Sequence, residues 1–210
     1  MVWHMRWKYA KQKNNFMGWS DMNYNKYFLI IIIILVLLVA TVLISSGCMS
    51  IQVENASIEL SEYIQLVKQG KDDELKLTIY YMSPYVFTQW PLSERELMEK
   101  RFEYIITVNG QRLREHIDLL EQVANADLIP IEKESFVDAR LYYVFETKKN
   151  RKIFSVCMWD SNGGILVNGI EVEEAPIFYE VVLPFLPEDA AENWEMYLID
   201  YLAEHGNRSS

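Results

Sequence analysis

Residues 28–47 read FLIIIIILVLLVATVLISSG and divide the chain into a short N-terminal segment and a longer C-terminal region. The stretch contains no ionisable side chain. At about 1.5 Å per residue, a helix of this length just crosses a hydrocarbon core of roughly 30 Å. It also lacks the polar stripe of a helix on the surface of a globular domain. The stretch therefore predicts a hydrophobic helix that is either a single membrane span or the apolar part of an export signal.

The segment before this stretch is basic. Residues 1–27 have a net charge of +4, from Arg6, Lys8, Lys11, Lys13 and Lys26 against Asp21. By the positive-inside rule, this charge keeps the N-terminus in the cytoplasm and places the C-terminal region on the outer side of the membrane. A start at Met17 or Met22 would give a basic segment of more usual length for a signal.

The end of the apolar stretch reads Ile44-Ser45-Ser46-Gly47-Cys48. These residues resemble the lipobox of bacterial lipoproteins, in which small residues precede a cysteine, although Ser45 stands where leucine is usual. The resemblance covers only the first 48 residues. It implies that Cys48 is the lipid attachment site and the first residue of the mature protein. A lipid anchor at Cys48 and a plain membrane span are both kept as alternatives.

The region beyond Cys48 is strongly acidic. The whole chain carries −10 and residues 1–27 carry +4, so −14 remains on the rest. A domain with this charge repels phosphate backbones, which excludes nucleic-acid binding. We expect residues 48–56 to form a tether, residues 57–206 one domain and residues 207–210 a tail.

The pattern of the exported region predicts an α+β domain, with a mixed or antiparallel sheet of four to six strands packed by three or four helices. Strands are expected over 75–82, 103–108, 140–146, 152–159 and 165–167. The last three form a meander. Helices are expected over 60–70, 93–101, 111–124 and 187–206. The apolar run 177–183, between two prolines, is either a helix or a strand by its pattern, and a helix is favoured. Cys157 lies in an apolar run and is interpreted as a small buried hydrophobe.

No motif of a known catalytic or metal site appears in the exported region, and we predict no cofactor. His116 falls beside the apolar face of the helix expected over 111–124, where a structural role is favoured. It is also the residue around which a hydrolase using carboxylates would have to be built. The basic hairpin tip, residues 148–152, is either a solvated turn or a contact for phosphate groups.

The most suggestive segment for binding is residues 80–91, YYMSPYVFTQWP. Its two prolines interrupt any regular strand, so its rings cannot all enter one core layer. Tyr85, Phe87 and Trp90 are therefore candidates for an exposed loop that stacks on a sugar or lines a peptide groove, against the alternative of core packing.

These features together predict a membrane-anchored extracytoplasmic protein at the bacterial cell surface. The favoured function is a non-catalytic binding or accessory module. Its partner would be a surface peptide, a sugar or a membrane protein. The alternative function is the surface hydrolase that uses His116.

Overall fold

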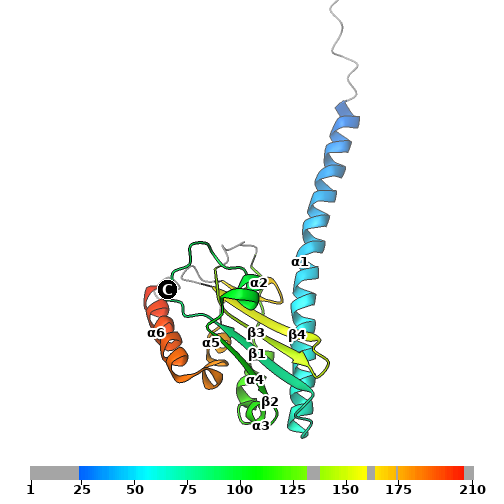
Figure 1. Cartoon of the computed structure of the whole chain (residues 1–210). Coiled ribbons are helices and arrows are strands. Elements are labelled where there is room, and N and C mark those ends of the chain that lie inside the picture. Colours follow the sequence, from blue (N-terminus) through cyan, green and yellow to red (C-terminus); the bar gives the residue numbers. More distant parts are fainter. Residues whose placement is uncertain (1–23, 132–137, 160–163, 174, 206–210) are drawn as a thin grey trace, which may run out of the picture. The chain divides into compact units, whose positions relative to one another are not determined.

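The computed structural model describes residues 24–131, 138–159, 164–173 and 175–205 (Figure 1). The chain divides into two compact units, Met1–Ile44 and Ser45–Ser210. The second unit contains an α+β domain with an antiparallel sheet, as the sequence predicts. Within the described residues, no helix has both the length and the apolar content required to cross a membrane.

Helix α1 (Tyr24–Lys68) does not end where the sequence predicts a tether. It continues through residues 48–56 and on to Lys68. The residues that it buries in the domain core follow helical spacing: Val53, Ala56, Leu60, Ile64 and Val67. A tether would leave Val53 and Ala56 in water, whereas burial removes their apolar surface from it. The domain therefore begins before residue 57, and the second half of α1 is part of its core.

Six strands form one sheet in the order β2-β1-β3-β4-β5-β6, and every neighbouring pair is antiparallel. Their bounds are β1 Leu75–Tyr81, β2 Tyr104–Asn109, β3 Ala139–Thr147, β4 Lys152–Trp159, β5 Ile165–Val167 and β6 Ile170–Val172. The first five match the predicted strands, and β3, β4 and β5 form the predicted meander. Strand β6, which follows β5 directly after the turn at Asn168 and Gly169, was not predicted.

The remaining helical segments are shorter than the sequence predicts. They are α2 Glu94–Glu96, the π-helical η2 Leu97–Arg101, α3 Gln111–Arg114, α4 Ile117–Ala124, α5 Ile177–Glu180, the 3₁₀ segment η3 Leu183–Phe185 and α6 Glu188–His205. The expected helix 111–124 is interrupted at His116, whose φ of −119° and ψ of 26° are not helical. Pro184, with no N–H to donate, lies in the short segment after α5. These breaks raise the number of helical segments above the predicted three or four.

The sheet has two differently covered faces. On one face, buried residues of α1, α4, α5 and α6 share a single hydrophobic cluster with Leu77, Ile79 and Tyr143. On the other face, Tyr142, Val144 and the fully buried Cys157 belong to a smaller cluster with residues of the segment between β1 and β2. The prediction that Cys157 is a buried hydrophobe is confirmed. The segment that covers this second face carries the aromatic residues singled out in the sequence.

Candidate functional site

The loop from β1 to α2, residues 83–93, contains Tyr85, Phe87 and Trp90 and is called the aromatic loop below. It begins where β1 ends, and Glu103 fixes this first turn because its Oε2 accepts a hydrogen bond from the Ser83 N–H at 3.0 Å. The Ser83 carbonyl accepts a further bond from the Val86 N–H at 3.1 Å. The loop therefore starts as a hydrogen-bonded turn.

Arg140, at the start of β3, holds the middle of the aromatic loop, and Asp138, just before β3, holds its end. The Arg140 Nη2 donates to Thr88 Oγ1 at 3.2 Å and pairs with Asp138 Oδ2 at 2.7 Å. The other carboxylate oxygen of Asp138 accepts from the Leu92 N–H at 2.9 Å. Because the Arg140 side chain is only 4% exposed, these charge-assisted bonds lie largely out of water, where they are stronger.

Alternate residues of the aromatic loop point into the domain and out of it. Val86 packs against the smaller hydrophobic cluster and Leu92 is buried in it. The three candidate rings are exposed instead: Tyr85 is 48%, Phe87 100% and Trp90 73% accessible. The inward residues and the Arg140 bonds fix the loop, so the outward rings are displayed on an ordered support.

The aromatic loop is also uncharged. Its sequence, SPYVFTQWPLS, contains no Asp, Glu, Lys, Arg or His, although the region beyond residue 27 carries −14. At the base of the loop, Phe102 and Ile105 are 37% and 48% exposed. Phe102 packs edge-on against Tyr80, with ring centroids 6.4 Å apart. Phe102 and Ile105 thus add two exposed apolar side chains beside the uncharged loop, where the Glu103 carboxylate is the charged group that binds it.

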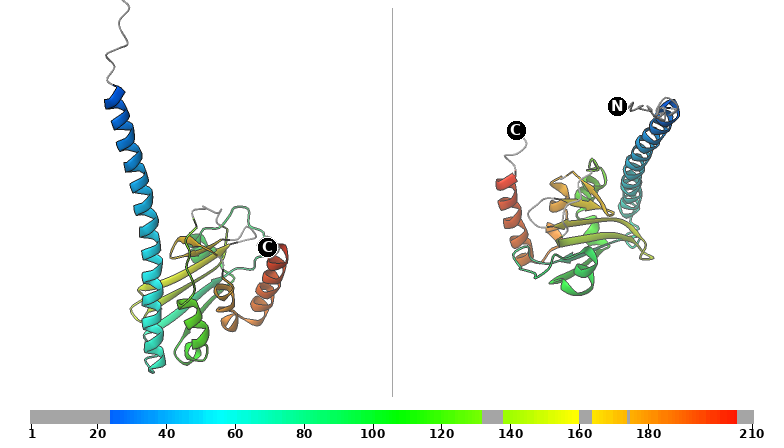
Figure 2. Two further views of the ribbon diagram at one scale, coloured as in Figure 1. Left: turned by 180° about the vertical axis from the view of Figure 1, so that it is seen from behind. Right: turned by 90° about the horizontal axis from the view of Figure 1, so that it is seen from above.

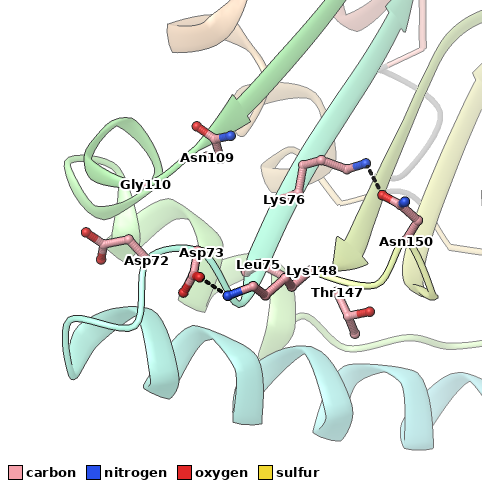
Figure 3. A pocket seen from close by; sticks show the side chains of 9 residues that line it. All are labelled: Asp72, Asp73, Leu75, Lys76, Asn109, Gly110, Thr147, Lys148 and Asn150. Carbon is pink, nitrogen blue, oxygen red and sulfur yellow. Dashed lines mark hydrogen bonds and ion pairs between the residues drawn. The ribbon is translucent and has the colours of Figure 1, made fainter.

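Two cavities lie elsewhere on the described surface. The first, of about 350 Å³, is at the other end of β1 and is lined by Asp72, Asp73, Leu75, Lys76, Asn109, Gly110, Thr147, Lys148 and Asn150 (Figure 3). Its four charged side chains, Asp72, Asp73, Lys76 and Lys148, each have a partner already. Lys148 pairs with Asp73 and lowers the pKa of that carboxyl, and Lys76 donates to Asn150 Oδ1 at 2.9 Å. Such exposed pairs contribute little free energy, and we assign this cavity no ligand.

The second cavity, of about 510 Å³, lies beside α4 and the start of α5. It is lined by Gln122, Asn125, Ala126, Asp127, Ile129, Glu173, Ala175 and Ile177. Neither cavity includes the three exposed rings or His116. The exposed rings of the aromatic loop thus belong to neither cavity.

His116 occupies the N-cap position of α4, and its ring packs edge-on against Phe185 at 5.1 Å between centroids. Within the described residues, no hydrogen bond joins its ring to a carboxylate, and no group of three or more His, Cys, Asp or Glu could hold a metal ion. The His–carboxylate pair that the hydrolase alternative requires is not formed in this part of the chain.

The basic hairpin tip between β3 and β4 is partly neutralised. Lys148 pairs with Asp73, and Arg151 pairs with Glu59 of α1. Arg151 also donates to Tyr63 Oη at 3.4 Å. These contacts dock the tip on α1 and leave less free positive charge than the sequence indicates, which favours the solvated-turn interpretation.

Cys48 falls within α1, but its side chain lies outside the described residues, so the lipid attachment stays a prediction. Sequence reasoning selected the three exposed rings but missed Arg140 and Asp138, which hold the loop. The available signal was a lone arginine at the start of the apolar strand RLYYVF. An arginine there must find acceptors because burying an unpaired charge is costly.

Comparison with known proteins yields no relative. No protein-family model matches the chain, and no curated protein or solved structure matches it.

Replacing Arg140 with lysine is expected to loosen the aromatic loop. One nitrogen of Arg140, Nη2, bonds both Asp138 and Thr88, whereas the lysine side chain is one bond shorter and lacks the planar guanidinium that places this nitrogen. Loss of a charge-assisted bond should lower the free energy of unfolding by about 1.5 kcal/mol and speed amide hydrogen exchange in residues 83–92. Hydrogen exchange with urea unfolding of the full chain in detergent measures both.

The matched control is Arg151→Lys, which changes an arginine that is 55% exposed and paired with Glu59. An exposed pair contributes about 0–1 kcal/mol, so this variant should leave exchange in the aromatic loop unchanged. Equal exchange rates in Arg140→Lys and the unaltered chain would show that Arg140 does not hold the loop.

Proposed function

We propose that this protein is a membrane-anchored extracytoplasmic binding module at the bacterial cell surface, and that the aromatic loop is its binding surface. The anchor is supported by the sequence. Residues 28–47 carry no charge, the preceding segment carries +4, and residues 44–48 resemble a lipobox. Cys48 would carry the lipid, or the apolar stretch would remain as a span.

The observation that carries the binding role is the exposure of three aromatic rings on a loop fixed by buried hydrogen bonds. Covering one large apolar side chain contributes about 1.5–3 kcal/mol, so the fully exposed Phe87 and the largely exposed Trp90 are strong potential contacts. The Arg140 and Asp138 bonds hold the backbone in place before any partner arrives, which reduces the entropy lost on binding.

The charge of the domain restricts the partner. The region beyond residue 27 carries −14, which disfavours polyanions, whereas the aromatic loop is uncharged. The three exposed rings line neither of the two cavities. Exposed aromatic rings pack well against a flat apolar face. A sugar ring, an aromatic peptide side chain and a lipid interface all provide one.

Photo-crosslinking in living cells tests this function. The full chain would carry p-benzoylphenylalanine in place of Phe87, or in place of Lys149 at the exposed hairpin tip as the matched control. Irradiation is expected to give an adduct at position 87 that position 149 does not give. Mass spectrometry of the adduct identifies it as lipid, glycan or protein.

The same cells report the location of the domain. Protease added outside spheroplasts should digest the domain, and the protein should leave the membrane fraction only with detergent. The mass of the mature N-terminus then separates a lipid on Cys48 from an intact span. A chain that is protected from the protease, or that yields equal adducts at positions 87 and 149, would contradict the proposed function.

A further inference from the structure

The aromatic loop lies at the end of the domain where the chain enters it. Within the second unit, α1 runs from Val53 to Lys68, a distance of about 24 Å, and residues 69–74 then reverse the chain. Strand β1 returns over about 23 Å, and the aromatic loop follows its last residue, Tyr81. Figures 1 and 2 show that β1 begins near the C-terminal end of α1 and that the loop after β1 lies at the other end of this strand.

The chain between the proposed anchor and the domain core is very short. Among the side chains of α1 that the structure describes, Val53 is the first that is buried, and only residues 49–52 separate it from Cys48. Four residues span about 6 Å as a helix and at most about 14 Å when extended. If Cys48 is the anchor, the end of the domain where the chain enters is therefore held against the lipid surface.

The composition of the aromatic loop suits the boundary between lipid and water. Tyrosine and tryptophan have apolar bodies with one polar group, and they are enriched at that boundary. Phe87 is fully exposed and has no polar atom to satisfy. No charged side chain within residues 83–93 would have to be dehydrated, whereas the acidic surface elsewhere would be repelled by anionic headgroups.

We infer that Tyr85, Phe87 and Trp90 insert into the interface of the membrane that anchors the chain, at neutral, zwitterionic phospholipid. This inference rests on the proposed function and names the ligand of the same loop. The anchor makes the second contact intramolecular, so a loop of weak intrinsic affinity is held at a high effective concentration of lipid. Two points of attachment would fix the orientation of the domain on the membrane.

Quenching of tryptophan emission by brominated lipid tests the contact. The full chain, purified in detergent and reconstituted into phosphatidylcholine vesicles with brominated acyl chains, is compared with Trp90→Phe. The other tryptophans are common to both proteins, so the difference between the two spectra belongs to Trp90. We expect this difference to be blue-shifted in plain vesicles and lost in brominated ones.

A control places the ring at the other end of the sheet. Lys149→Trp in the Trp90→Phe background puts a tryptophan at the exposed hairpin tip, and its emission should be insensitive to bromine. Quenching of Trp90 alone supports insertion. Equal quenching at both positions would overturn it, because it would indicate non-specific adsorption of the domain.

The remaining outcomes separate this inference from the proposed function. If the chain floats with the vesicles but Trp90 is not quenched, the membrane contact is wrong and the anchor stands. A shift of Trp90 emission on adding soluble cell-wall oligosaccharides would then make a glycan the ligand of the loop. If the chain does not float with the vesicles, the proposed anchor fails and this inference fails with it.

Discussion

Replacing Trp194 with alanine is expected to lower the free energy of unfolding by about 3–5 kcal/mol, the range for removal of a fully buried large aromatic side chain. Trp194 lies on α6 and is 0% exposed. Its ring contacts those of Tyr81, Tyr179 and Tyr197, at centroid distances of 6.2, 6.2 and 5.4 Å. Alanine would leave a cavity where α6 packs on the sheet.

Trp194→Phe is the matched control. Phenylalanine keeps one ring and removes the indole N–H, which is buried and has no hydrogen-bond partner within the described residues. An unpaired buried polar group costs about 1–3 kcal/mol, so its removal offsets part of the lost volume. Urea unfolding of the full chain in detergent is followed by circular dichroism. The unaltered chain should be the most stable, Trp194→Phe intermediate and Trp194→Ala the least stable. A loss below about 1 kcal/mol for alanine would contradict this packing.

Replacing Ile64 with alanine in α1 is expected to lower the free energy of unfolding by about 2–5 kcal/mol. Ile64 is 0% exposed and belongs to the main hydrophobic cluster with Leu77 and Ile79 of β1. Removing most of its side chain deletes contacts that join α1 to the sheet. The same unfolding experiment measures the loss.

The same helix supplies a control with identical chemistry. Ile58 is 52% exposed, so Ile58→Ala should change the stability by no more than about 0.5 kcal/mol. If both alanine variants unfolded at the same urea concentration as the unaltered chain, the second half of α1 would not be part of the domain core. A flexible linker before the sheet would then be the better description.

Strands were more predictable than helices because their signal is local. The β-branched and aromatic run over residues 75–82 indicates a strand whatever it packs against, and β1 covers Leu75–Tyr81. Helical spacing over residues 111–124 indicated one helix, but the chain breaks it at His116. The ring of His116 packs on Phe185, more than 60 residues later, and no local pattern reports such a contact.

The tether was wrong for a related reason. Residues 48–56 follow an apolar stretch and contain no strong pattern by themselves. Their helical conformation continues that of α1, and burial of Val53 and Ala56 depends on the sheet formed by later strands. The buried residues from Val53 to Val67 are spaced three or four positions apart. This spacing indicates a packed helix rather than a tether only when a sheet is present for that helix face to pack on.

Composition alone identifies an uncharged stretch ending at Cys48, an acidic α+β region, and an uncharged segment rich in aromatic residues. Which rings of that segment face water depends on long-range packing. Tyr81 is buried and Phe87 is fully exposed, although they are only six positions apart. The difference arises because Tyr81 packs on Trp194, whereas the loop holding Phe87 is fixed by Arg140. Both partners are distant in sequence, and burial depends on what packs against a side chain rather than on its neighbours along the chain.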